Sequence, residues 1–304
     1  MSITQDIRAA FQQRDNALTK LLLINGAVFA VLIILKAIFF VSQANGVYAL
    51  IMRQLELSAN PSVLMRHPWT VLTYAFIHAD FFHILFNMLN LYWFGQVIRE
   101  YLGNRRLVSL YILGALAGAT CFWLSFNSLP VFQPLAEAGQ TVVGASAAVT
   151  AIIVAAATLL PDYTFMVILL GPVKIKWIAL VVVLVSVAGI SGGNAGGQLA
   201  HLGGALLGFV FIKQMQAGRD MGRPVQAIGR WLTRLTTRRP AMEVSYRTGG
   251  SGARGGSALA APKAKVATGT APEEVDLILD KISRSGYESL SKDEKQKLFR
   301  ASQQ

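Results

Sequence analysis

The 304-residue sequence predicts an all-α membrane protein, a six-transmembrane-helix bundle followed by a largely disordered C-terminal tail that carries short helices. The mean hydropathy is +0.47, and only 14% of the residues are charged. A soluble globular protein carries about 25% charged residues. Long stretches between residues 20 and 214 hold almost no charge, whereas the chain after them is basic and rich in Gly, Ala and Ser. These observations divide the chain into an apolar core and a polar tail.

A transmembrane helix needs about 20 mostly apolar residues. The first candidate is too long for a signal-peptide core and has no evident small-residue cleavage site, so it is expected to stay as a membrane anchor. The predicted spans are residues 21–41, 77–97, 107–126, 142–160, 173–189 and 198–213.

Positive charge predicts the orientation of these spans. Lys and Arg occur in residues 1–20, in the loop after the second span, before the fifth span and in the tail, whereas the loops 127–141 and 190–197 have none. Since Lys and Arg favour the cytoplasmic side, we expect both termini in the cytoplasm and the protein in a bacterial cytoplasmic (inner) membrane. The net charge of +12 indicates contact with an anionic lipid bilayer rather than nucleic acid, because no nucleic-acid motif accompanies it.

Ser146 and His201 are the candidate reactive pair. They follow the outer starts of spans four and six by about four and three residues, which at about 1.5 Å per residue predicts the same shallow depth of about 5–8 Å. A serine hydroxyl needs a base to become a nucleophile, and no Asp or Glu lies in these two spans. The pattern therefore predicts a dyad. The alternatives are a serine that packs or bonds within its own helix and a histidine that joins two helices.

His83 and Asn87 lie four residues apart, so they share one helix face at the same expected level. Both side chains can donate hydrogen bonds to an oxyanion, and the backbone N–H of Ser146 is a third candidate donor. The alternative is a polar lining that holds structural water. We expect His78 nearer the surface, where it supports the loop above, and we assign no role to His67.

Small residues make a close approach of spans four and six feasible. Gly204 and Gly208 form a small-xxx-small face on span six, and Gly144 begins the matching small-residue stretch of span four. The alternative is helix packing unrelated to catalysis. Close packing is also what a dyad requires, since the imidazole must come within about 3 Å of the hydroxyl.

Three ordered motifs resemble the rhomboid family of intramembrane serine proteases. They are His78-Ala-Asp-Phe-Phe-His83-Ile-Leu-Phe-Asn87-Met88, Gly144-Ala-Ser146, and Ala200-His201-Leu-Gly-Gly204-Ala-Leu-Leu-Gly208. The resemblance covers roughly residues 20–215. It implies a nucleophile at Ser146, a general base at His201 and oxyanion donors at His83 and Asn87. It also implies transmembrane-helix proteins as substrates, cut near their outer ends without metal or cofactor.

Three positions depart from the family pattern. Ala147 stands where a second glycine is usual, and its methyl group is expected to crowd span four or stiffen the turn at the nucleophile. Thr150 replaces an aromatic residue that often packs on the histidine, and Trp69-Thr70 stands where Trp-Arg often anchors the first outer loop. Two other functions remain open: an inactive relative that binds transmembrane helices, and a small transporter, which would need charged residues near the membrane midplane.

The remaining segments give the domain boundaries. Residues 1–20 are a cytoplasmic segment, 21–214 the protease core, 215–245 a basic amphipathic stretch, 246–271 a flexible linker and 272–304 a short helical motif. Within the last, Ser291 and Glu294 predict a capping box. The stretch from Leu279 to Ser291 resembles a C-terminal motif attached to rhomboids of the Bacteroidetes bacteria. We expect it to dock a cytoplasmic partner.

Overall fold

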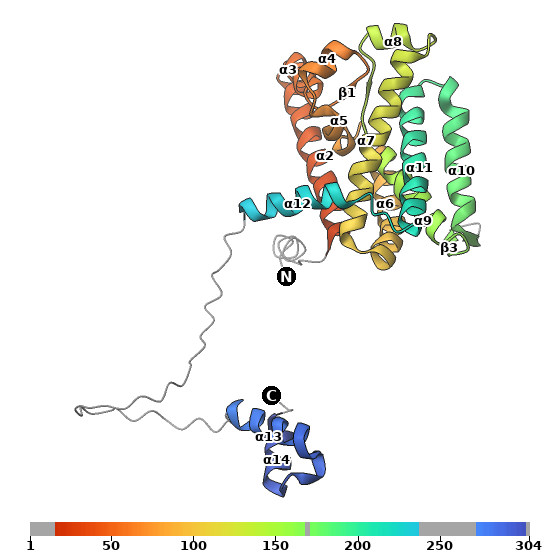
Figure 1. Ribbon diagram of the computed structural model, residues 1–304. Helices are drawn as coiled ribbons and strands as arrows, with labels where there is room; N and C mark the ends of the chain where they lie inside the picture. The colour runs from red at the N-terminus through yellow and green to blue at the C-terminus, as the bar shows by residue number, and fades with distance from the viewer. Residues whose placement is uncertain (1–15, 168–170, 237–271, 302–304) are drawn as a thin grey trace, which may run out of the picture. The chain divides into compact units, whose positions relative to one another are not determined.

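The computed structural model describes residues 16–167, 171–236 and 272–301 and is mostly helical (Figure 1). The chain divides into two compact units, Met1–Pro240 and Ala241–Gln304. The long apolar helices of the first unit are α2 (Ala17–Val41), α6 (Phe81–Leu102), α7 (Asn104–Ser128), α9 (Ser146–Leu159), α10 (Ile175–Ala188) and α11 (Ala195–Gln216).

Short elements connect these helices. Between α2 and α6 lie α3 (Asn45–Arg53), β1 (Leu57–Ser58), α4 (Pro61–Arg66), α5 (Thr70–Thr73) and the 3-10 turn η1 (Tyr74–Phe76). Between α7 and α9 lie α8 (Gln133–Glu137) and β2 (Thr141–Val142). The hairpin β3 (Thr164–Val167) and β4 (Gly171–Lys174) precedes α10, η2 (Gly189–Ser191) precedes α11, and α12 (Arg223–Thr236) follows it.

The structure supports only part of the expected six-span topology. Among the described residues, α2, α7 and α11 are long and apolar enough to cross a membrane, and the segment Thr70–Phe76 together with α6 forms a fourth candidate bent by 93°. Helices α9 and α10 have 14 residues each, fewer than the about 20 that a membrane crossing needs. Six spans are therefore not confirmed by helix length.

The fourth predicted span differs because its first residues are extended. Thr141 and Val142 pair antiparallel with Ser58 and Leu57, and the helix begins only at Ser146. An extended residue advances the chain by about 3.3 Å, against about 1.5 Å in a helix. Ser146 is therefore the first residue of α9 rather than about the fifth residue of a helix, and α9 is correspondingly shorter than the predicted span.

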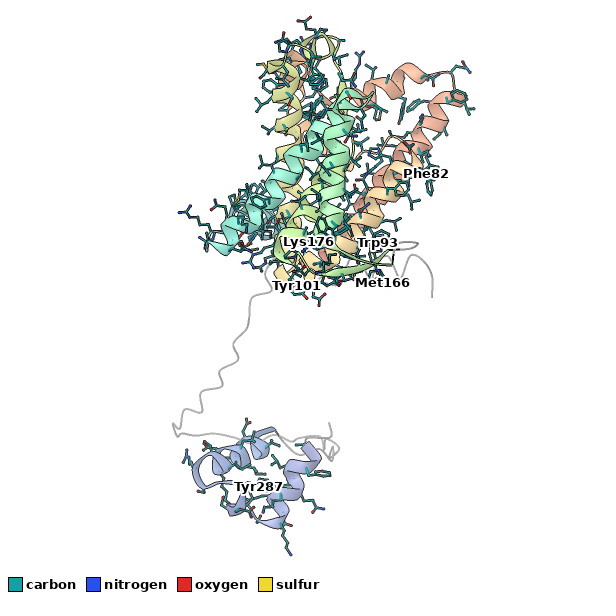
Figure 2. All side chains as sticks on the ribbon, turned by 90° about the vertical axis from the view of Figure 1, so that its right-hand side faces the viewer. Phe82, Trp93, Tyr101, Met166, Lys176 and Tyr287 are labelled. Carbon is teal, nitrogen blue, oxygen red and sulfur yellow. The ribbon has the colours of Figure 1, made fainter. Side chains whose placement is uncertain are left out.

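Helices α7, α9 and α11 form the densely packed centre of the bundle, and most residues of α9 are buried. Helix α2 lies at the periphery and is held there by a buried polar contact. Asn25 Nδ2 donates to the Tyr111 hydroxyl at 3.0 Å, and that hydroxyl donates to Ala75 O at 2.8 Å. Several large apolar side chains point outward, including Phe82 and Trp93 of α6 (Figure 2).

The two ends of the bundle differ in charge. Helices α3, α4 and α8 lie at one end, and the β3–β4 hairpin and α12 at the other (Figure 1). At the hairpin end, Lys174 and Lys176 each contact Asp162 at 2.9 Å, and they lower the pKa of this exposed carboxyl to about 2. Arg106 pairs with Asp220 at 3.2 Å and joins the start of α7 to the chain after α11. We call this the basic end.

The C-terminal unit contains α13 (Pro272–Ser285), η3 (Tyr287–Ser289) and α14 (Lys292–Ala301). The predicted capping box is present, because Ser291 Oγ accepts from Glu294 N at 3.3 Å and the Glu294 carboxylate accepts from Ser291 N at 2.7 Å. The predicted linker 246–271 lies outside the described residues. The predicted helix in the basic stretch is confirmed over Arg223–Thr236, and its placement on a membrane remains a prediction.

Candidate active site

The chain bends by 93° between the segment Thr70–Phe76 and α6, and this break positions the first two polar residues of the site. Asp80 is the N-cap of α6, and its carboxylate accepts from His83 N at 2.9 Å. His83 therefore lies in the first helical turn, and Asn87 follows one turn later on the same face. Asn87 Nδ2 donates to His83 O at 2.8 Å. An amide nitrogen carries two hydrogens, so one of them stays available to a ligand.

Gly144 brings the turn before α9 against His83. Its φ of +129° is a conformation that side chains disfavour, and its N–H donates to Tyr74 O at 2.9 Å. A Cβ at this position would lie 2.7 Å from His83 Nε2 and 3.5 Å from Ser146 Oγ. Only glycine lets the His83 ring and the Ser146 hydroxyl approach the same point.

His201 lies in the second turn of α11, whose N-cap is Asn194. A Cβ on Gly204 would overlap Ala147 O, and a Cβ on Gly208 would overlap Ala151 O. The backbones of α9 and α11 therefore touch directly over one helical turn. Ser146 precedes Ala147 by one residue and His201 precedes Gly204 by three, so this contact brings the two side chains to one level of the bundle.

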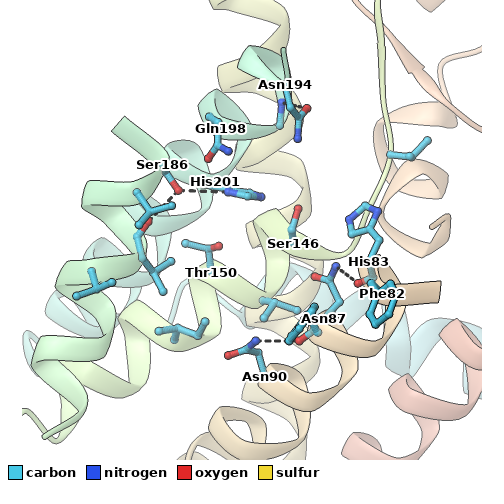
Figure 3. A pocket seen from close by; sticks show the side chains of 18 of the residues that line it. Phe82, His83, Asn87, Asn90, Ser146, Thr150, Ser186, Asn194, Gln198 and His201 are labelled. Atoms are coloured by element: carbon cyan, nitrogen blue, oxygen red, sulfur yellow. Dashed lines mark hydrogen bonds between the residues drawn. The ribbon is translucent and has the colours of Figure 1, made fainter. Parts of the chain in front are cut away.

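Ser146, His201, His83 and Asn87 all line a single cavity of about 530 Å³ (Figure 3). Its walls come from α6, α9, α10 and α11. The three glycines, Gly144, Gly204 and Gly208, do not line the cavity but pack behind it. The predicted residues are thus together in the structure, although their chemical roles remain proposals.

His78 is buried in the turn before α6, and its expected position nearer the membrane surface stays a prediction. It is 5% exposed, and its ring lies edge-on to the His83 ring with centroids 5.1 Å apart. Neither ring nitrogen has a hydrogen-bond partner among the described residues. The turn between η1 and α6 folds inward, which buries His78 behind His83. Its contact with that ring suits a supporting position.

The departure from the family pattern suggested that the methyl group of Ala147 would crowd α9 against its neighbours. The structure shows no such separation of the helices. The Ala147 methyl group packs against Gly118 of α7, where a Cβ would overlap it. The missing side chain at Gly118 makes room for the extra methyl group. Thr150 lines the same cavity as Ser146, in the place where an aromatic residue was expected by resemblance.

Sequence reasoning missed several cavity residues, chiefly Asp80 and Ser186. Asp80 could have been found as a capping residue directly before an apolar helix. Ser186 is the only hydroxyl residue of α10, and a polar side chain in an apolar span is a signal of function. Its Oγ lies 3.2 Å from His201 Nδ1.

Together, the fold and the cavity define a helical membrane protein with a serine and a histidine on adjacent helices. Residues 65–215 match the family model described as Rhomboid domain. The chain is 31% identical over 159 residues to RHOMBOID-like protein 12, mitochondrial, of Arabidopsis thaliana, covering 49% of this chain and 47% of that protein. It is 32% identical over 166 residues to Rhomboid protein 1, mitochondrial, of Saccharomyces cerevisiae, covering 52% and 45%.

The chain is a rhomboid family protein. This family comprises intramembrane serine proteases, which act on transmembrane substrates within the bilayer, and inactive relatives. The chain spans about half the length of the two relatives above. Residues 270–304 match a family of unknown function (DUF6576).

The expectation of a bacterial cytoplasmic membrane is wrong by this comparison. The relatives above are named mitochondrial, and a third, Rhomboid-like protein 16 of Arabidopsis thaliana, is named chloroplastic, with 33% identity over 109 residues that cover 36% of this chain and 34% of that protein. These names point to organellar membranes. Charge asymmetry between loops distinguishes two sides of a membrane, but it carries no information about which membrane.

Proposed function

We propose that this protein is an intramembrane serine endopeptidase that cleaves transmembrane segments with a Ser146–His201 dyad. The observation that carries the proposal is the common cavity of these two side chains, on two helices whose backbones touch at Gly204 and Gly208. A short separation between nucleophile and base is the geometric requirement for proton transfer. Packing at these two glycines supports the proposal because it places the helices that carry the two side chains next to each other.

In the proposed reaction, Ser146 Oγ attacks the carbonyl carbon of the scissile peptide while His201 takes the hydroxyl proton. The carbonyl oxygen becomes an oxyanion. The C–N bond then breaks as His201 returns the proton to the leaving amine, which leaves an acyl ester on Ser146. A water molecule repeats the attack with His201 as base and releases the new carboxylate.

His83 and Asn87 are the proposed side-chain donors to the oxyanion. Gly144 brings His83 Nε2 close to the nucleophile, and Asn87 has an amide hydrogen beyond the one that it gives to His83 O. The N–H of Ser146 is a third donor, because the first residues of a helix have no intrahelical acceptor. Donors that strengthen as charge develops lower the barrier by about 3–4 kcal/mol each.

The proposal includes six spans, with the shorter α9 and α10 completed by their adjoining extended segments. The charge difference between the basic end and the opposite end supports this topology. Since α9 and α11 both start away from the basic end, cleavage is expected in the half of the membrane opposite to it. The membrane is organellar if this protein shares the location in its relatives' names. The helical unit of residues 272–301 is expected to bind a partner protein.

The decisive experiment uses the purified full chain in detergent with a fluorophosphonate probe and a model transmembrane substrate. We expect covalent labelling at Ser146 and one dominant cleavage product. Ser146→Ala should lose both while keeping its melting temperature. Thr158→Ala is the matched control, because it removes another α9 hydroxyl, which donates only to Val154 O at 2.7 Å.

Cleavage by Ser146→Ala at the wild-type rate would refute the dyad. A folded wild-type protein that binds transmembrane helices but neither labels nor cleaves would instead be an inactive relative. For the oxyanion donors, His83→Ala and Asn87→Ala should each lower kcat about 100- to 1,000-fold with little change in KM. A rise in KM with unchanged kcat would assign these residues to substrate binding.

A further inference from the structure

Ser186 is a buried hydroxyl on an otherwise outward-facing part of α10. It is 2% exposed, whereas Val185 and Val187 on either side are 60% and 51% exposed. Its side chain therefore points into the bundle, where it lines the cavity together with His201. Figure 3 shows the His201 ring between Ser186 of α10 and Ser146 of α9.

Two hydrogen bonds of Ser186 determine which atom carries which proton. Its Oγ lies 2.9 Å from Val182 O and 3.2 Å from His201 Nδ1. A hydroxyl has one hydrogen, and a carbonyl oxygen can only accept. The hydrogen of Ser186 must therefore go to Val182 O. The contact with His201 is then a hydrogen bond only if Nδ1 carries a proton and donates it to Ser186 Oγ.

We propose that Ser186 is a positioning residue that selects the Nδ1–H tautomer of His201. Neutral imidazole carries one proton, so a proton on Nδ1 leaves the lone pair on Nε2, the nitrogen that can reach Ser146. The opposite tautomer has no lone pair on Nε2 and cannot accept the hydroxyl proton. This inference rests on the proposed protease function, in which His201 is the base.

The same contact restricts the rotation of the ring. Held at Nδ1 from α10, the imidazole keeps its orientation toward α9 when its partner hydroxyl changes during the reaction. A carboxylate does this in serine triads, with a stronger, charged hydrogen bond. Ser186 is neutral, so we expect a modest contribution, about tenfold in kcat, which corresponds to one ordinary hydrogen bond.

The direct test is ¹⁵N NMR of the full chain, labelled at histidine, in detergent micelles, because protonated and unprotonated ring nitrogens resonate in separate regions. A spectrum of His201→Gln assigns the His201 signals. We expect the wild-type protein to carry its His201 proton on Nδ1. In Ser186→Ala, a population with the proton on Nε2 should appear, and kcat should fall about tenfold with unchanged KM. Ser186→Thr keeps the hydroxyl, so its His201 tautomer and its kcat should match those of the wild-type protein.

Ser109→Ala is the matched control, because Ser109 is also buried and its hydroxyl donates to a carbonyl of its own helix, Arg105 O, at 2.9 Å. It should change neither kcat nor the His201 spectrum. A wild-type His201 protonated on Nε2, or a Ser186→Ala protein with the wild-type tautomer and kcat, would overturn the inference. The tautomer is measured without substrate. A protein whose His201 carries its proton on Nδ1 but that does not cleave would therefore refute the protease proposal and leave the contact of Ser186 with His201 intact.

Discussion

Helices α11 and α10 both pack beside α9, but they do so in different ways. Helix α11 meets α9 backbone against backbone at Gly204 and Gly208, where no side chain fits between the helices. Helix α10 buries only Ile175, Ala179 and Ser186, and most of its large side chains are exposed. The two proposed reacting residues lie on the tightly packed pair. The side chain that contacts His201 from outside this pair comes from the loosely packed helix.

This difference predicts where the site tolerates change. At the α9–α11 contact an added atom must move a backbone, because the atom that it meets is a carbonyl oxygen. On the outer face of α10 an added or removed atom changes only a contact with lipid, which is as apolar as the side chain. Mutational effects should therefore be large on the first surface and small on the second.

The largest effect is expected for Gly204→Ala. The new methyl group would overlap Ala147 O, so α9 and α11 must separate. We expect a loss of about 3 kcal/mol in unfolding free energy and a fall of about 100-fold in cleavage rate, because a displacement of about 1 Å at the dyad has that cost. Melting temperature and kcat of the purified protein measure the two effects.

Gly26→Ala is the control for this substitution. Gly26 lies in α2, and a Cβ there would have no neighbour within 4 Å. Alanine is preferred over glycine in helices by about 1 kcal/mol, so this variant should be slightly more stable and fully active. A Gly204→Ala protein that matched it in both measurements would show that α9 and α11 do not touch as described.

The second effect concerns Gly118, which faces the methyl group of Ala147. Gly118→Ala would place two methyl groups in one space and bring a Cβ to 2.9 Å from Ala200 O. We expect a loss of about 1–3 kcal/mol in stability. The double variant Gly118→Ala, Ala147→Gly moves the methyl group from one helix to the other and should recover part of the loss, but the Ala200 contact remains. If the stability losses of the two single variants simply added in the double variant, the methyl group of Ala147 would not be in contact with position 118.

Much of this contact was predictable from sequence, and the reason is chemical. Gly204 and Gly208 recur at helical spacing after His201, and glycine in a transmembrane helix has few uses except close approach. The start of α9 at Ser146 was not predictable, because the residues before it include β2, which pairs with β1 about 85 residues earlier in the chain. Hydropathy is the same for an extended and a helical apolar segment. The prediction from hydropathy therefore included residues 142–145 in the helix.

Ser186 and Ala147 show the same limit at the level of side chains. In the sequence, Ser186 is a single hydroxyl residue in a run of valines. Its contact with His201 becomes visible only in the packing of α10 against α11. Ala147 appeared unfavourable because its partner Gly118 lies on another helix. Capping boxes such as Ser291–Glu294 were predictable because both partners lie within four residues.

The third prediction concerns Asn25, the buried polar contact of the peripheral helix α2. Asn25→Ala removes its hydrogen bond to the Tyr111 hydroxyl, which keeps its bond to Ala75 O. Such contacts between membrane helices contribute about 0.6 kcal/mol on average, so we expect a loss of that size and unchanged kcat. A double-mutant cycle with Tyr111→Phe isolates the pair. A coupling energy of zero would show that α2 does not depend on this contact.

The smallest effect is expected on the outer face of α10. Leu184 is 56% exposed and does not line the cavity, so Leu184→Ala exchanges a contact with lipid for a smaller one. We expect less than about 0.5 kcal/mol of lost stability and a kcat within twofold of wild type. Leu110→Ala is the comparison, because Leu110 of α7 is fully buried and its truncation leaves a cavity that costs about 2–5 kcal/mol. If Leu184→Ala were as destabilising as Leu110→Ala, the outer face of α10 would have to be covered by protein, and the loosely packed helix would then be part of a larger interface.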